Sequence, residues 1–394
     1  MNPLIRLLQQ PERVVIGIMS GTSLDGIDVA LTRLTGSGLD FRVELMAFHS
    51  EAYAPALREA LLRNATIATS NVRDLSQLNV RLAHAYAGAA RALLADAGYP
   101  LGDVDAVGCH GQTVFHVPEP ADCAGMPTAS TLQIGDPSTL ATLLGVPVVG
   151  QFRQADMALG GQGAPLVPYF DYVFLRDAHE TRGLLNLGGI ANLTVIPAAA
   201  SIDVITAFDT GPANMVIDAL ARRLYDQAYD KGGQIAARGT VRQPLLKTLL
   251  NDPYYALSPP KSTGREKYTP AYVDALLEEA AAMPPEDVLA TATAFTAETI
   301  ARAYTDFFAE HTPIARLIAA GGGIHNATLM RMLAERLAPI PVYTLRDFGL
   351  DPDAKEAVCF AVLAHETLNG VGSNVPSATG ARRPAVLGVL AMPS

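Results

Sequence analysis

Two segments of the chain share one plan, in which an apolar run leads into a tip of small residues and a second apolar run leaves it. The first is VVIGIMSGTSLDGIDVAL at residues 14–31, and the second is LLNLGGIANLTVI at residues 184–196. Residues 14–19 are rich in Val and Ile, as in a buried strand, and residues 27–34 alternate apolar with polar positions. Asp25-Gly26 is a strong hairpin-turn signal between them. The plan predicts two related halves, each presenting a hairpin tip to a shared cleft.

Helix and strand patterns alternate along the rest of the chain. An apolar stripe over residues 72–97 predicts a helix, and a short strand at 103–109 ends at His110-Gly111. Further on, the pattern predicts a helix over 287–310, a strand over 315–320, and helices over 326–337 and 353–368. This alternation indicates α/β layers.

The length of the chain predicts two domains. Its 394 residues are too many for one ordinary core, and a Gly-rich stretch at 145–165 is the candidate boundary. We therefore expect an N-terminal α/β domain over 13–150 and a C-terminal one over 151–394, whose tail is free to return to the first domain.

Composition excludes several classes of protein. The chain has 29 Lys and Arg against 39 Asp and Glu, a net charge of −10, which disfavours nucleic acid and anionic membranes as partners. Its three cysteines are too few and too scattered for a disulfide framework or a zinc site, and they suit a reducing cytoplasm. No apolar run reaches the roughly 18 residues that span a membrane. We expect a soluble, cytoplasmic protein.

The glycine-rich tips have the composition of anion sites. Glycine allows close backbone approach, and Ser and Thr add donors. The usual phosphate motifs are absent, however: there is no G-x-x-x-x-G-K-[ST], and GIMSGTSLDG leads into a strand instead of a helix. The alternative is an ordinary hairpin turn. A third cluster, AAGGGIHN at 319–326, follows a strand and precedes a helix, which favours close approach of a flat ligand over a simple tight turn.

The acidic candidate is Asp209, in AFDTGPANMVID at 207–218. Pro212 and the apolar run after Asn214 indicate the start of a helix. Asp209 is then either a helix N-cap or Asx-turn residue, or a general base directed into the cleft from the helix N-terminus. The residues themselves leave both interpretations open.

Eight segments, in order along nearly the whole chain, resemble the anhydro-N-acetylmuramic acid kinases of bacteria. They are GIMSGTSLDGIDVAL at 17–31, CHGQTVFH at 109–116, LQIGDPSTLA at 132–141, FRQADMALGGQGAPLVP at 152–168, LLNLGGIANLTVI at 184–196, FDTGPANMVIDA at 208–219, PKSTGRE at 260–266 and AAGGGIHNATLM at 319–330. One such segment would be weak, but eight collinear segments are specific.

The resemblance implies the fold of the sugar kinase, actin and heat-shock chaperone superfamily. That fold has two similar RNase-H-like α/β domains with an interdomain nucleotide cleft. The implied reaction uses ATP, Mg²⁺, water and 1,6-anhydro-N-acetylmuramate, and yields N-acetylmuramate 6-phosphate and ADP in peptidoglycan recycling. A homodimer is also implied.

The resemblance further implies roles for individual residues, with Asp209 as the catalytic base that deprotonates water. Implied nucleotide contacts lie in the two hairpins and the glycine cluster: Ser20, Gly21, Thr22, Ser23, Leu24, Asp25, Gly26, Ile27, Gly188, Gly189, Asn192, Gly321, Gly322 and Gly323. Implied sugar contacts are His110, Gln112, Arg153, Asp156 and Asn214, and an arginine there could pair with the lactyl carboxylate. Met19-Ser20-Gly21-Thr22 replaces the superfamily's Asp-x-Gly-Thr, so no metal ligand is assigned, and Asp25 and Asp28 are only candidates.

Two other classes compete with a small-molecule kinase. One is an ATPase of the same fold, either a chaperone, for which no peptide-binding domain follows helix 353–368, or a filament former. The other is a hydrolase that opens an anhydrosugar without ATP, with Asp156 as its second carboxylate. Under that hypothesis the two phosphate-like tips would have no purpose.

Overall fold

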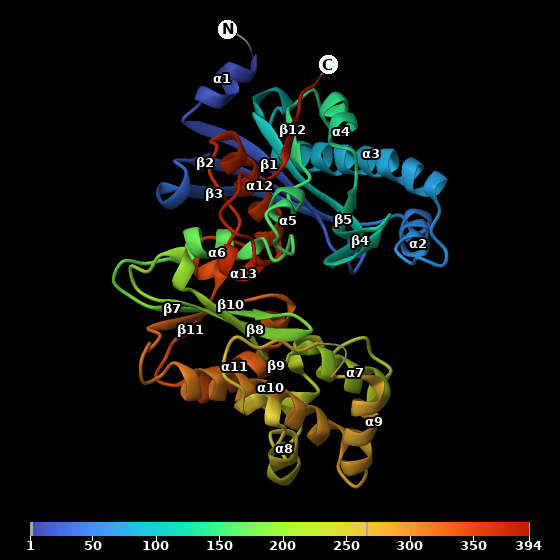
Figure 1. The fold of residues 1–394 in the computed structure, drawn as a ribbon. Helices are drawn as coiled ribbons and strands as arrows, with labels where there is room; N and C mark the ends of the chain where they lie inside the picture. The colour runs from blue at the N-terminus through green and yellow to red at the C-terminus, as the bar shows by residue number, and fades with distance from the viewer. Residues whose placement is uncertain (1–2, 265–266, 394) are drawn as a thin grey trace. The chain divides into compact units, whose positions relative to one another are not determined.

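The computed structural model describes residues 3–264 and 267–393, and the chain divides into two compact units. Unit 1 contains the chain up to Phe174 and again from Gly349, and unit 2 is Leu175–Phe348. This division differs from the expected one at residue 150. The difference is residues 151–174, which were expected in the second domain and pack in unit 1. The segment after 349 also packs in unit 1, so the red C-terminal elements of Figure 1 lie among its blue and green ones.

Unit 1 is built on one mixed sheet. Its strands are β1 (Glu12–Ser20), β2 (Gly26–Thr35), β3 (Arg42–Ala52), β4 (Ala106–Cys123), β5 (Met126–Ile134), β6 (Val148–Gly150) and β12 (Val389–Ala391). Its helices are α1 (Pro3–Gln9), α2 (Pro55–Asn64), α3 (Val72–Ala97), α4 (Pro137–Leu144), α5 (Gln154–Ala158), α6 (Val167–Leu175), α12 (Lys355–Leu368) and α13 (Pro376–Thr379). The strand order is β12-β6-β4-β1-β2-β3, and β5 pairs with β4.

Helices cover both faces of this sheet, which explains why β1 is apolar at almost every position. Val14, Ile16 and Ile18 pack in a core with α3, whereas α12 packs on the other face against β1, β2 and β4. The approach of α12 is very close: a Cβ on Gly17 would lie 1.8 Å from the backbone oxygen of Ala357. Glycine is therefore required at position 17.

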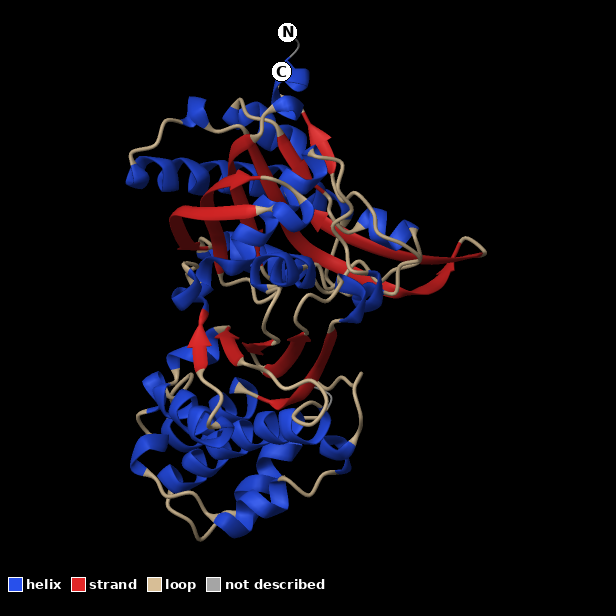
Figure 2. Ribbon diagram, turned by 90° about the vertical axis from the view of Figure 1, so that its left-hand side faces the viewer, coloured by secondary structure: helices blue, strands red, loops and turns tan. Residues whose placement is uncertain are grey.

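Unit 2 repeats the arrangement of sheet and helices. Its strands are β7 (Arg182–Leu187), β8 (Ile190–Ile196), β9 (Thr206–Pro212), β10 (Arg316–Ala320) and β11 (Val342–Thr344), in the order β11-β10-β7-β8-β9. Its helices are α7 (Asn214–Tyr225), α8 (Gln243–Leu249), α9 (Pro270–Glu279), α10 (Pro285–Phe307) and α11 (Ala327–Leu337). Figure 2 shows the strands in red and the helices in blue.

The two sheets share one topology. In unit 1, β1 pairs antiparallel with β2 and β2 with β3, while β1 and β4, and then β4 and β6, are parallel. In unit 2, β7, β8 and β9 are antiparallel in the same way, and β7, β10 and β11 are parallel. Each sheet thus places an antiparallel hairpin beside parallel strands. The predicted α/β class with two similar units is confirmed.

Two local predictions are wrong. The strand expected to end at His110-Gly111 continues to Cys123. Gly111 adopts φ +76°, and beyond this glycine β4 pairs with β5 in a long ribbon (Figure 2). The first hairpin does not turn at Asp25-Gly26. Gly26 already belongs to β2, and Leu24 takes the left-handed conformation with φ +57°.

Candidate active site

The tip of the first hairpin is anchored by Leu24. This side chain is only 4% exposed, while Thr22 and Ser23 are exposed to solvent. The Leu24 amide donates to the Gly21 oxygen at 3.2 Å, and the Leu24 carbonyl accepts from Arg58 Nε at 3.0 Å. The left-handed backbone is therefore stabilised by burial and two hydrogen bonds, and the exposed Thr22 and Ser23 carry hydroxyl groups at the tip.

Buried polar side chains support this tip from below. Ser20 Oγ lies 2.7 Å from the Tyr86 hydroxyl. Gln112 is fully buried; its Nε2 donates to the Gly21 oxygen at 3.0 Å, and its Oε1 accepts from the Tyr53 hydroxyl at 3.2 Å. Gln112, expected as a sugar contact, thus braces the tip.

His110 and Arg153 form a buried pair in unit 1. Arg153 Nε and Nη2 both donate to His110 Nε2, at 3.0 and 2.8 Å, and Arg153 Nη1 donates to the Gly163 oxygen at 2.7 Å. Burial and the neighbouring guanidinium lower the pKa of His110 to about 3, so the ring is neutral with its proton on Nδ1. Because Nε and Nη2 of Arg153 both donate to His110, this edge of the guanidinium does not bind a carboxylate in the same arrangement.

Asp156 anchors the loop that follows α5. The side chain is completely buried, and its Oδ1 accepts from Asn374 Nδ2 at 2.6 Å and from Thr379 Oγ1 at 2.7 Å. Its Oδ2 accepts from the Gly163 amide at 2.8 Å. Three donors and full burial suit an anchor between this loop and the C-terminal segment, and they do not favour the second acid that a hydrolase needs.

In unit 2, the tip of the second hairpin is tied to the start of α7. The Gly188 oxygen accepts from the Asn214 amide at 3.0 Å, and the Gly189 oxygen accepts from the Met215 amide at 3.1 Å. Asn214 Nδ2 also donates to the Leu187 oxygen at 3.1 Å. The first amides of α7 are thus satisfied by the tip, and Asn214 fixes the tip in place.

Asp209 lies in β9, with both carboxylate oxygens held by donors. Asn192 Nδ2, from the neighbouring strand β8, donates to Oδ1 at 3.0 Å. The backbone amide of Thr263 donates to Oδ2, also at 3.0 Å. Each oxygen keeps a further lone pair, so this half-buried carboxylate is oriented and still able to accept a proton.

The backbone of Asp209 is held as well. Its amide donates to the Lys261 oxygen at 3.0 Å, and its carbonyl accepts from the Tyr254 hydroxyl at 2.7 Å. The interpretation of Asp209 as a helix cap is wrong, because α7 begins at Asn214 and its N-cap is Ala213. Asp209 is instead a strand residue with four hydrogen bonds, which favours a chemical role over a capping role.

The glycine cluster after β10 is explained in part by packing. Cβ atoms on Gly321 and Gly323 would each lie 2.6 Å from side-chain atoms of Asn186 and Leu187, at the end of β7. Gly322, in contrast, is exposed, and its nearest neighbour would be 3.9 Å away. Two of the three glycines are thus needed by the turn itself, and Gly322 is the position that leaves room for a ligand.

Three contacts of Asp209 went unassigned in the sequence: Thr263, Lys261 and Tyr254. Lys261 and Thr263 belong to PKSTGRE at 260–266, which carried the family resemblance but no role, and its positions 265 and 266 lie outside the described residues. That motif was the sequence signal from which Lys261 and Thr263 could have been predicted, and Tyr254 lies outside it.

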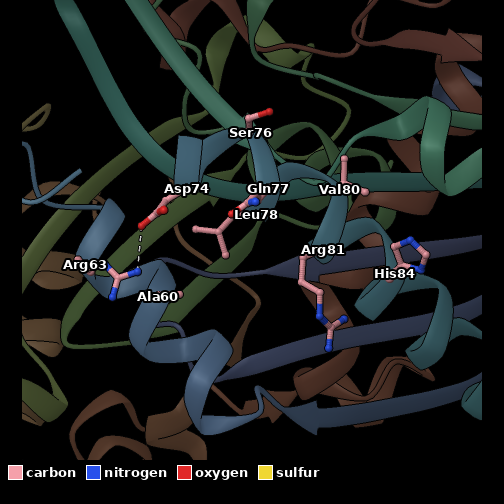
Figure 3. A pocket seen from close by; sticks show the side chains of 9 residues that line it. All are labelled: Ala60, Arg63, Asp74, Ser76, Gln77, Leu78, Val80, Arg81 and His84. Atoms are coloured by element: carbon pink, nitrogen blue, oxygen red, sulfur yellow. Dashed lines mark hydrogen bonds and ion pairs between the residues drawn. The ribbon is translucent and has the colours of Figure 1, made fainter. Parts of the chain in front are cut away.

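Other features of the described residues do not add to this site. A hollow of about 620 Å³ between α2 and α3 is lined by residues such as Arg63, Arg81 and His84, none of which was expected to bind a ligand (Figure 3). Within residues 3–264 and 267–393, no cluster of three or more His, Cys, Asp or Glu could hold a metal ion. In that same part of the chain, no helix is long and apolar enough to cross a membrane.

Comparison with known proteins identifies the family of this chain. The model of the family described as anhydro-N-acetylmuramic acid kinase matches residues 13–393. This chain belongs to that family. A kinase of this name from Salinibacter ruber is 54% identical over 100% of both chains, and one from Caldanaerobacter subterraneus is 42% identical over the same share. An anhydro-N-acetylmuramic acid kinase from Francisella tularensis is 45% identical over 95% of this chain and 97% of its own.

Proposed function

We propose that this protein uses ATP to convert 1,6-anhydro-N-acetylmuramate and water into N-acetylmuramate 6-phosphate and ADP, as a step of peptidoglycan recycling. Membership of the anhydro-N-acetylmuramic acid kinase family supports the substrate and the reaction. The observation that carries the mechanism is the Asp209 carboxylate, which is oriented by Asn192 and by the Thr263 amide.

Asp209 acts as the general base in this mechanism. It takes a proton from the water that attacks the anomeric carbon, while the bond from that carbon to O6 breaks. O6 then takes the γ-phosphoryl group of ATP, and ADP leaves with the oxygen that joined its β-phosphorus to the γ-phosphorus. The two donors on the carboxylate direct its free lone pairs, so the base needs no reorganisation before the reaction.

The first hairpin contributes the phosphate contacts. Thr22 and Ser23 offer hydroxyls at the exposed tip, and Gln112 holds the Gly21 carbonyl so that the turn keeps its shape. In unit 2, Gly322 leaves room for the nucleoside, and Asn214 fixes the second tip.

Asp25 and Asp28 offer the hard oxygen ligands that Mg²⁺ takes. Burial, with the nearby charges of Asp353 and Asp25, raises the pKa of the Asp28 carboxyl despite a hydrogen bond with Ser50. A cation at this carboxylate would offset that unfavourable environment, and Asp25 and Asp28 are the residues that would hold the metal. When bound, Mg²⁺ neutralises charge on the phosphates.

An ADP-release assay with and without 1,6-anhydro-N-acetylmuramate tests the proposal. We expect release only with the sugar, and a phosphorylated sugar by mass spectrometry. In ¹⁸O-labelled water the sugar phosphate should carry no label on phosphorus, whereas simple ATP hydrolysis would label inorganic phosphate. ATP-dependent light scattering would favour a filament former, and ring opening without ATP would favour a hydrolase.

We also propose that the protein acts in the cytoplasm as a homodimer, with neither nucleic acid nor membrane as a partner. The net charge of −10 and the scarcity of cysteine support the location and the absence of anionic partners. Sedimentation at several concentrations tests the dimer.

A further inference from the structure

The ammonium group of Lys261 lies inside unit 2 in an unusual environment. Its Nζ donates to the backbone oxygens of Tyr254 and Tyr255, at 3.1 and 3.2 Å. It also lies over aromatic rings, 4.9 Å from the centroid of Tyr254 and 5.0 Å from that of Phe307. The ring of Phe208, the residue before Asp209, is 5.9 Å away. Carbonyl dipoles and ring faces both attract a cation, so this site holds the charge of Lys261 specifically.

The same residue contacts the candidate base through its backbone. The Lys261 oxygen accepts from the Asp209 amide at 3.0 Å, and two residues later the Thr263 amide donates to Asp209 Oδ2 at 3.0 Å. Tyr254, whose ring and carbonyl hold the ammonium, donates its hydroxyl to the Asp209 carbonyl at 2.7 Å. One cation thus connects the two segments that contact Asp209 from outside its sheet.

We infer that Lys261 is a positioning residue for Asp209: its ammonium, held by carbonyls and aromatic rings, fixes segment 260–264 so that the Thr263 amide orients the catalytic carboxylate. The inference rests on the proposed function of Asp209. Thr263 lies between η6 (Pro253–Ala256) and α9 (Pro270–Glu279), and the described residues 257–264 belong to no helix or strand that would fix their backbone. The side chain of Lys261 supplies that restraint, and small displacements of a catalytic group are costly to turnover.

A competing role for Lys261 is direct contact with a phosphate. Two of the three ammonium protons are used by the carbonyls of Tyr254 and Tyr255, and ring faces lie around the group. Burial lowers the pKa of the Lys261 ammonium, and the charge of Asp306 opposes that effect. A lysine that binds phosphate would instead keep its protons free for the ligand.

Unit 2 offers a matched control. Lys267 also lies over the Tyr254 ring, 5.4 Å from its centroid, but its Nζ forms an ion pair with Asp252 at 2.6 Å. Lys267→Met therefore removes a cation from the same ring and leaves the contacts of Asp209 in place.

The experiment compares Lys261→Met, Lys261→Arg and Lys267→Met in the full chain, by steady-state kinetics and by calorimetric titration with a non-hydrolysable ATP analogue. We expect Lys261→Met to lower kcat about 10- to 100-fold, with both KM values and the analogue Kd within about threefold of wild type. Lys261→Arg, which keeps a cation over the rings, should recover most of the turnover. Lys267→Met should match wild type within about twofold.

The outcomes separate this inference from the proposed function. If the wild-type protein releases no ADP with the anhydrosugar, the proposed function fails. If the wild type is active and Lys261→Met keeps its kcat, only the positioning role is overturned. A tenfold weaker analogue Kd with unchanged kcat would identify Lys261 as a phosphate ligand and also overturn it. Should Lys261→Met not fold, Lys261→Gln, which keeps a donor for the carbonyls and removes the charge over the rings, is measured instead and must also lower kcat with an unchanged analogue Kd.

Discussion

The variant Asp209→Asn tests the base most directly, because the structure predicts that it changes chemistry more than geometry. One carboxylate oxygen becomes an amide NH₂ group. The Thr263 donor is a backbone N–H and cannot change, so the remaining oxygen must face it. The NH₂ group then faces Asn192, whose own amide can turn over and present its oxygen. Both hydrogen bonds persist in neutral form.

The cost to stability and the cost to turnover therefore differ. A hydrogen bond to a charged group contributes roughly 1.5–3 kcal/mol and a neutral one about 0.5–1.5 kcal/mol. For a half-buried carboxylate we expect the free energy of unfolding to fall by about 1–2 kcal/mol. Loss of a general base costs about 10²- to 10⁴-fold in turnover, which corresponds to roughly 2.7–5.4 kcal/mol of transition-state stabilisation.

Three measurements on one preparation decide the matter: ADP release with the anhydrosugar, calorimetric titration with an ATP analogue, and urea unfolding. Nucleotide affinity should stay near that of wild type. In the double variant Asn192→Asp with Asp209→Asn, the carboxylate moves to the neighbouring strand and the hydrogen bond between the two side chains is restored. Part of the lost stability should return, because the bond from Thr263 stays neutral, and turnover should not return. Turnover of Asp209→Asn within about threefold of wild type would refute the assignment.

Three further predictions concern unit 1. Gly17→Ala should lower the free energy of unfolding by about 3 kcal/mol or more, because its Cβ would lie 1.8 Å from a backbone oxygen of α12. Gly88→Ala, on an exposed helix face with nothing within 4 Å of the new Cβ, should raise it by about 0.5–1 kcal/mol. Thermal melting compares the two variants, and equal melting points would contradict the packing argument. Gln112→Leu should weaken binding of an ATP analogue about fivefold by freeing the Gly21 carbonyl, and leave the KM for the sugar nearly unchanged; the reverse result in titration and kinetics would restore Gln112 as a sugar contact. Burial lowers the pKa of His365 from 6.5 to about 4. As the pH falls, the imidazole of the unfolded chain therefore takes up a proton before that of the folded protein does. The stability that neutral His365 contributes is present above pH 6.5 and is lost between pH 6.5 and 4. From pH 7.5 to pH 5, the free energy of unfolding measured in urea should fall by on the order of 2 kcal/mol more for wild type than for His365→Gln. Equal falls in the two proteins would refute the pKa shift.

Much of the fold could be predicted because the spacing of apolar residues that indicates a helix or a hairpin lies within a single segment of the sequence. The apolar stripe over residues 72–97 coincides with α3, and the paired apolar runs around each tip became the hairpins β1–β2 and β7–β8. β4 was underestimated because its continuation past Gly111 depends on its partner β5, which pairs only after the backbone turns at that glycine. The turn at Leu24 was missed because burial of its side chain stabilises a backbone conformation that leucine disfavours.

The candidate site was predictable in its residue types and less so in their uses. The donors on Asp209 come from Asn192, which is next to it in the sheet, and from Thr263, which is 54 positions away in sequence. Only the folded chain shows the second contact. Gln112 and Arg153 have the chemistry of ligand contacts, yet the structure directs much of their donor capacity to Gly21 and His110. Tertiary contacts, which no single sequence displays, decide between these uses.

The way unit 2 is inserted has a consequence for synthesis on the ribosome. Leu175–Phe348 is continuous, so all of unit 2 has been translated before α12 and β12. The helix that covers β1 and the strand that pairs with β6 emerge only after unit 2. The first hairpin must therefore wait until unit 2 has been translated for the helix that encloses its sheet, and chaperones or proteases would meet that open face first.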